Sequence, residues 1–326
     1  MQGLYEPMIS RDVAALPAAV RRFRATHSQD ELFAAVARFA VLAFAPSQHS
    51  KHALLSCLSA HELRVESGSR YDDLLTECAI YASSSRQPWS EPPVSDPPAI
   101  DRTQRGDLDE LRAAIQSKDR LRGERWLARR LEDESLPADL LRVASEDFDD
   151  LGHKVIIATA SWRLASILGT RGLYVTLRNA IAELTGYHSA ETYRERGVAL
   201  DEASLLERLV DCAEFEKGSL PSTHAIFLLD AGLEASEVAK DPGISARVRD
   251  FLTGSTSECA PGESLPPAPV EVPIYRLARD YGQFLKSYAV AKRLRRRFPN
   301  SELDRFLAAT QHNLLHGPSF EEFSFA

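Results

Sequence analysis

Histidine is the residue type in this chain whose placement could support catalytic chemistry. Well-separated segments that are predicted to be helical carry His49, His52 and His61, then His153, then His224, and finally His312 and His316. A neutral imidazole is a common ligand of transition metals and a common proton shuttle. The usual nucleotide, hydrolase and metalloprotease motifs, such as G-x-x-x-x-G-K-[ST], G-x-S-x-G and H-E-x-x-H, are missing from the sequence. Any site would therefore be assembled from several helices.

The segment 47–63, SQHSKHALLSCLSAHEL, places its three histidines on two sides of one helix. At about 100° per residue, His49 and His52 share a side with two serines, which would leave room for a ligand. His61 falls on the opposite side with Leu58 and Cys57. One helix cannot bring all three rings together. The alternatives are a ligand site or a polar helix face plus one hydrogen-bonded core histidine.

The segment 146–153, EDFDDLGH, allows two arrangements that differ at Gly152. A straight helix would put Glu146, Asp149 and His153 on one face, as in carboxylate–histidine sites of helical bundles. A bend at Gly152 would instead put His153 on the apolar stripe of the next helix, which runs through Ile156. In that case His153 is a buried histidine near a cluster of acids, and is either a site residue or a structural hydrogen-bonder.

His224 follows Pro221-Ser222-Thr223, where a serine or threonine can cap the start of a helix. Helical phase then turns His224 inward together with Phe227. Near the helix N-terminus the dipole opposes protonation, so the imidazole should stay neutral and able to bind a metal.

His312 and His316 share a face at i, i+4 just before Gly317-Pro318. This spacing suits a shared metal, but the pair points away from the apolar residues of its helix. Histidines at a helix end also interact favourably with the dipole, so the sequence leaves open whether these two, or His49, join a site.

The elements that must position these residues are helices. Apolar residues recur at i, i+3 and i+7 through most of the chain, and alternating strand patterns and hairpin turns are missing. We therefore predict an all-α fold, an irregular bundle of about a dozen helices, with a short helix–turn–helix at 108–131. No repeat of fixed period supports a solenoid.

Ten of the eighteen prolines fall in two segments, 84–98 and 254–273, which also contain serine and acidic residues. Such composition is typical of linkers or long surface loops. The expected organisation is an N-terminal helical block (1–83), a linker or loop (84–104), a central block (105–253), a second linker (254–273) and a C-terminal helical pair (274–326) on the same body.

The chain has 326 residues, a net charge of −8 and a pI near 5.7, which argues against nucleic acid or an anionic membrane as partner. Its basic cluster at 292–297 is interpreted as the solvated C-terminal end of a helix. The first residues lack a secretory signal, and no apolar stretch approaches membrane-spanning length. Four scattered cysteines are expected to be free thiols, and the protein to be cytoplasmic.

Three segments, KHALLSCLSAHEL, LGHKVIIATASWRLA and STHAIFLLDA, together resemble the histidine-bearing helices of questin oxidase-like proteins and related bacterial helical domains. Members of that family are linked to oxygen-dependent, Baeyer–Villiger-type ring cleavage of polyketides. The resemblance implies that His52 or His61, together with His153 and His224, lines one cavity. It covers about a tenth of the chain.

The leading hypothesis is a metal-dependent, oxygenase-like oxidoreductase acting on a hydrophobic or aromatic small molecule. The expected metal is iron, a homo-oligomer is left open, and Glu146 or Asp149 would be a further ligand or a proton acceptor. The expected metal ligands are His52, His61, His153 and His224. Trp162, Phe227 and the aromatic tail 320–325 could wall the pocket. The alternatives are a non-catalytic helical scaffold or partner-binding protein, and metal-free binding of a small molecule between helices.

Overall fold

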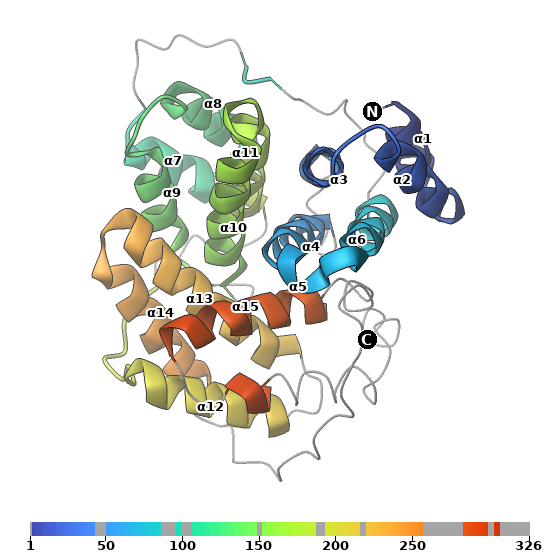
Figure 1. The fold of residues 1–326 in the computed structure, drawn as a ribbon. Coiled ribbons are helices and arrows are strands. Elements are labelled where there is room, and N and C mark those ends of the chain that lie inside the picture. The colour runs from blue at the N-terminus through green and yellow to red at the C-terminus, as the bar shows by residue number, and fades with distance from the viewer. Residues whose placement is uncertain are drawn as a thin grey trace. The chain divides into compact units, whose positions relative to one another are not determined.

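The computed structural model describes residues 2–42, 50–85, 96–98, 106–148, 152–186, 193–215, 220–256, 283–298 and 303–306, and over these ranges it contains helices but no strand (Figure 1). The predicted all-α fold is confirmed. The fifteen α-helices are α1 (Gln2–Ser10), α2 (Leu16–Arg24), α3 (Gln29–Leu42), α4 (Ser50–Glu62), α5 (Arg64–Ser67), α6 (Tyr71–Ser85), α7 (Leu108–Gln116), α8 (Arg120–Arg130), α9 (Leu136–Ala144), α10 (His153–Leu168), α11 (Thr170–Gly186), α12 (Glu202–Phe215), α13 (Leu220–Ala239), α14 (Pro242–Ser255) and α15 (Gln283–Arg297). Two 3₁₀ turns, Val13–Ala15 and Gly68–Arg70, and a helical turn at residues 303–306 are also described.

Several helices begin at an aspartate that caps their first turn. The Asp107 carboxylate accepts from the backbone N–H of Glu110 at the start of α7, and Asp119 does the same for Arg122 at the start of α8. Such caps satisfy backbone donors that the helix itself leaves unbonded. They divide 108–131 into the helix–turn–helix pair that the sequence predicts.

Contacts between Cα atoms divide the chain into two compact units, each made of segments that are distant in the sequence. Unit 1 comprises Met1–Pro137, Ile157–Ala190 and Val272–Leu285. In it α3, α4 and α6 pack against one another, and α11 packs against α3, α7 and α8. Trp126 of α8 is fully buried, and its indole N–H donates to the Asp107 carbonyl at 2.7 Å.

Unit 2 comprises Ala138–Ile156, Glu191–Glu271 and Lys286–Ala326. Its centre is the mutual packing of α12, α13 and α14, and α13 and α14 lie side by side in Figure 1. Two arginines tie α9 and the residues after it to this group. The Arg142 guanidinium donates to the Ala239 carbonyl at the end of α13, and Arg247 of α14 donates to Ser145.

The basic cluster of α15 is engaged in ion pairs within unit 2. Arg293 donates to the buried carboxylate of Asp230, Arg297 to Glu237 and Arg295 to Asp304. The end of α15 is exposed at residues 295–297, which agrees with a solvated helix end. No described helix is long and apolar enough to cross a membrane.

The cysteines differ from the expectation that all four are free. Cys57 and Cys78 are free and buried, whereas Cys212 is disulfide-bonded. Spacing along the chain does not report distance in space, which is why this bond was not predicted. Cys259 lies outside the described residues, as do most of the two proline-rich segments, so their linker character stays a prediction.

Candidate metal centre

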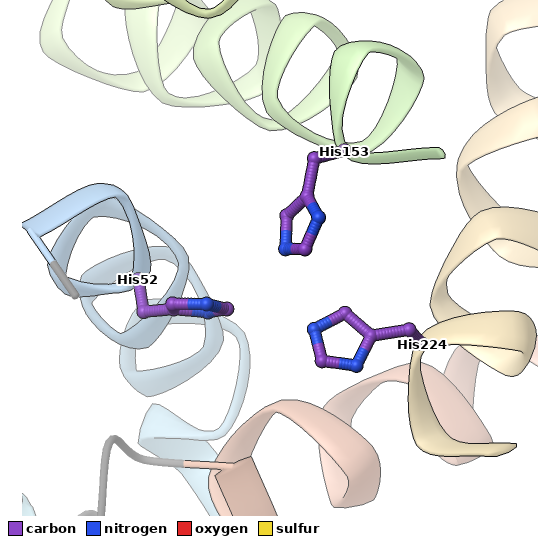
Figure 2. A group of neighbouring side chains, drawn as sticks. All are labelled: His52, His153 and His224. Carbon is purple, nitrogen blue, oxygen red and sulfur yellow. The ribbon is translucent and has the colours of Figure 1, made fainter. Parts of the chain in front are cut away.

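Unit 2 brings the side chains of His153 and His224 together by itself. The two side chains come from the first residue of α10 and from the second turn of α13, and they are 4% and 5% exposed. Their ring centroids are 4.8 Å apart, with an angle of 56° between the planes (Figure 2). Two buried imidazoles at this distance can offer nitrogens to one ion.

Gly152 sets the position of His153. Its φ of +76° is a left-handed conformation that glycine adopts without strain, so α10 starts anew at His153. A Cβ at this position would lie 2.5 Å from the Leu228 side chain of α13, four residues after His224. The glycine therefore allows the start of α10 to approach α13 closely.

The bent arrangement, and not a straight helix through Gly152, is thus the one that the structure adopts. Helix α9 ends at Ala144 and α10 begins at His153, so Glu146 and His153 do not share a helix face. Ile156 and Leu164 are buried along the same stripe as His153, but the stripe stops before Ile167, which is 39% exposed.

His224 has an aromatic neighbour on its own helix. Its ring lies 5.9 Å from that of Phe227 in an edge-to-face arrangement. Phe227 is 4% exposed and continues the inward face of α13. The predicted inward orientation of both residues is confirmed, and Phe227 supplies an apolar surface beside the imidazole.

One ring nitrogen from each of His52, His153 and His224 lies within 4.8 Å of the others (Figure 2). His52 is half-buried. Among the described residues, this is the group of histidine, cysteine and acidic side chains whose spacing could hold a metal ion.

Two of the three histidines have a buried lysine as their neighbour in the sequence: Lys51 precedes His52, and Lys154 follows His153. Lys51 pairs with Glu183 at 3.1 Å within unit 1, and Lys154 pairs with Asp147 within unit 2. Each lysine side chain is 4% exposed or less. Buried charges persist when they are paired, so each ion pair anchors the helix that carries a histidine. Neither ion pair was predicted from the sequence, although Asp147 and Lys154 are only seven residues apart in the chain.

His61 lies in a different environment from the group. Its ring packs 4.5 Å from that of Phe33 on α3, and it is not one of the three clustered residues. Burial, together with the charge of Arg64, lowers the pKa of His61, while Asp30 opposes this effect. These features are typical of a histidine that packs in a helix–helix contact.

The remaining predicted site residues are distributed as follows. Glu146 is half-buried outside the group, and its carbonyl accepts from the Tyr193 N–H at 2.6 Å. Trp162 is half-buried on α10. Asp149, His49, His312, His316 and the aromatic tail 320–325 lie outside the described residues. The roles assigned to Glu146 and Asp149 stay predictions.

In comparisons with known proteins, no family model matches this chain, and no curated protein or solved structure matches it either.

Proposed function

We propose that this chain is a metal-dependent oxidoreductase in which His52, His153 and His224 hold a transition-metal ion. The observation that carries the proposal is the pair of almost fully buried imidazoles of His153 and His224, whose ring centroids lie 4.8 Å apart within unit 2. The segments that resemble the questin oxidase-like family contain these three histidines and His61. The proposed substrate is a hydrophobic or aromatic small molecule.

The donor set fits a first-row transition metal. Imidazole suits iron, zinc, copper and nickel, whereas magnesium and calcium prefer oxygen ligands. Metal–nitrogen bonds of about 2.1 Å place the nitrogens of neighbouring ligands roughly 3–3.5 Å apart. Spacings of up to 4.8 Å are therefore within the reach of small ring rotations. Three protein ligands also leave coordination positions for other molecules.

The protein's own residues would divide the work in a simple way. The three histidines bind the ion in their neutral form, and Phe227 offers an aromatic face to an apolar substrate. The ion pair of Asp147 with Lys154 fixes the start of α10 and hence the position of His153. When bound, iron supplies Lewis-acid and one-electron chemistry that no side chain in the group possesses.

The reaction class we propose is insertion of one oxygen atom of O₂ into a carbon–carbon bond next to a carbonyl. The second oxygen atom leaves as water, which requires two protons and two electrons. The electrons must come from an added reductant, such as a reduced nicotinamide or ascorbate. Electrons, protons and both oxygen atoms are then accounted for.

Metal content tests the site first. Protein purified without a His-tag, and again after anaerobic incubation with iron(II), should contain about one equivalent of metal per chain. His52→Ala, His153→Ala and His224→Ala should each lose it. The control His27→Ala should retain it, because His27 stacks on Phe23 at 4.0 Å and is not in the group. Metal-free wild type after incubation, or metal retained in all three variants, would favour the scaffold hypothesis.

Turnover tests the chemistry separately. The iron-loaded protein is incubated with polycyclic aromatic ketones, a reductant and ¹⁸O₂, and the products are analysed by mass spectrometry. A product containing one ¹⁸O atom, absent with His153→Ala, is the expected result. A protein that binds one metal ion but oxidises no ketone in the panel would keep the metal site and lose the oxidoreductase assignment.

A further inference from the structure

We propose that Tyr193 is a positioning residue that holds His153 beside His224. The inference rests on the proposed function, in which His153 is a metal ligand, and it adds a residue that acts on the site through other residues. Tyr193 follows α11 and precedes α12 in the chain. All the residues that carry the inference belong to unit 2.

The side chain of Tyr193 is anchored to α14. Asp250 of that helix is 2% exposed, and its carboxylate accepts from the Tyr193 hydroxyl at 2.8 Å. It also accepts from the backbone N–H groups of Arg196 at 2.6 Å and Val198 at 2.8 Å. Burial, followed by the hydrogen bond to Asp250, raises the pKa of Tyr193 to about 12, so the hydroxyl is a donor at neutral pH. A buried carboxylate with several donors is a strong acceptor, which fixes the far end of Tyr193.

The near end of Tyr193 contacts the segment 146–148 at two points. Its backbone N–H donates to the Glu146 carbonyl at 2.6 Å. Its ring lies 5.1 Å from that of Phe148, at an angle of 70° between the planes. Phe251 of α14 completes the cluster, with its ring 4.9 Å from Phe148 and 5.6 Å from Tyr193. Edge-to-face contacts of this kind favour one relative orientation of the rings.

The same segment is bonded to the start of α10. The Gly152 N–H donates to the Phe148 carbonyl at 3.0 Å, and Lys154 pairs with Asp147. These two bonds are made by the residues immediately before and after His153 in the sequence. Residues 146–148 therefore connect Tyr193 to both neighbours of the histidine, so a shift of Tyr193 is passed on to the imidazole.

The expected size of the effect follows from how metal sites depend on their surroundings. Groups that orient a ligand without binding the ion typically change metal affinity about 10–100-fold when they are removed. Tyr193 acts through the backbone and a neighbouring ring, and not through a bond to the imidazole. We therefore expect a change of about tenfold, at the low end of that range.

The first measurement is binding of cobalt(II) to the full chain, followed by its visible absorption spectrum. Tyr193→Ala should weaken cobalt(II) binding about tenfold and alter the spectrum of the bound ion. Tyr193→Phe keeps the ring and the backbone bond, so it should stay within about threefold of wild type and keep the spectrum. A residue that served stability alone would change neither the affinity nor the spectrum of the folded protein.

Thr253→Val is the matched control. The Thr253 hydroxyl of α14 accepts from the Leu200 N–H at 3.1 Å, so it ties the stretch after Tyr193 to the same helix at a different point. Thr253 is also buried, at 6% exposed. This variant should lose stability but keep the cobalt(II) affinity and spectrum of wild type.

The second measurement needs no metal. Hydrogen exchange of the metal-free protein should show that Tyr193→Ala speeds exchange of the Gly152 N–H about tenfold or more, because its acceptor at Phe148 is released. Thr253→Val should instead speed exchange at Leu200 and leave Gly152 unchanged. If Tyr193→Ala does not fold, Tyr193→Leu takes its place in both measurements.

The outcomes separate this inference from the proposed function. Wild-type cobalt(II) affinity together with wild-type exchange at Gly152 in the folded Tyr193 variants overturns the positioning role and leaves the proposed function intact. A wild-type protein that binds no metal, combined with faster exchange at Gly152 in Tyr193→Ala but not in Thr253→Val, removes the metal-dependent function. That second result keeps Tyr193 as the residue that positions His153.

Discussion

Two inward-facing histidines, His61 on α4 and His153 on α10, lie in contrasting surroundings. His61 packs against the ring of Phe33, whereas His153 packs against the imidazole of His224. Each is followed by a charged residue in an ion pair: Glu62 with Arg163, and Lys154 with Asp147. Both histidines point inward, so orientation does not distinguish a packing histidine from a candidate ligand. They differ in the side chain that each contacts on the neighbouring helix, which is a phenyl ring for His61 and a second imidazole for His153.

The largest expected difference is in metal affinity. His153→Ala should weaken binding of iron(II) or zinc by a factor on the order of 1,000, since loss of a hydrogen-bond partner behind a ligand already costs about 10–100-fold. His61→Ala should leave affinity within about threefold of wild type, because a non-ligand contributes little. Competition titration with a chelating dye measures both. If the two variants lost metal affinity equally, His61 would have to be counted among the metal ligands together with His153.

The next largest difference is expected in how much each of the two ion pairs contributes to the free energy of unfolding. Asp147→Asn removes the carboxylate partner of a lysine that is 2% exposed, and should lower the free energy of unfolding by about 3–5 kcal/mol. Glu62→Gln should cost about 1 kcal/mol, because Glu62 and Arg163 are 16% and 20% exposed and water screens their attraction. Urea unfolding gives both values. The double variant Asp147→Asn/Lys154→Met should recover part of the loss, and no recovery would contradict the ion-pair explanation.

The approach of α10 to α13 predicts a smaller effect. Gly152→Ala adds a Cβ at a φ of +76° and 2.5 Å from Leu228, and should cost about 1–3 kcal/mol. Gly169→Ala, at the other end of α10, is the control, because its φ is +73° and nothing lies within 4 Å of the added atom. Gly169→Ala should lower the free energy of unfolding only by the cost of the backbone strain at a positive φ. Equal losses in thermal unfolding would mean that the contact with Leu228 is unimportant.

The smallest effect concerns pH. Because the pKa of His61 is lowered in the folded protein, the unfolded chain binds more protons just below its ordinary pKa of about 6.5. The stability from neutral His61 is complete above that pH and is lost as pH falls toward the folded-state pKa. His61→Gln should flatten this decline, by less than the about 1.4 kcal/mol per pH unit that one proton permits. An unchanged slope in urea unfolding between about pH 5 and 7.5 would refute it.

Much of the fold could be predicted from local sequence. Helical periodicity gave the fold class and the α7–α8 pair, and helical phase placed His52 and His61 on different sides of α4. Gly152 marked a bend as one of two alternatives. Which inward residues meet depends on tertiary packing, which no local pattern contains. The pairing of Lys154 with Asp147 and the packing of His61 on Phe33 therefore became apparent only in the structure.

The discontinuous composition of the two units has a consequence for synthesis on the ribosome. Unit 1 begins at the N-terminus but also includes α11, and unit 2 includes residues 286–297 of α15. Unit 2 therefore cannot be completed until nearly the whole chain has been made. At about 5–20 residues per second, the apolar faces of α12–α14 would wait roughly 2–8 s for residues 256–297 to emerge. Nascent chains should thus depend on chaperones that shield hydrophobic surface, and products truncated before α15 should leave the apolar surface of unit 2 uncovered.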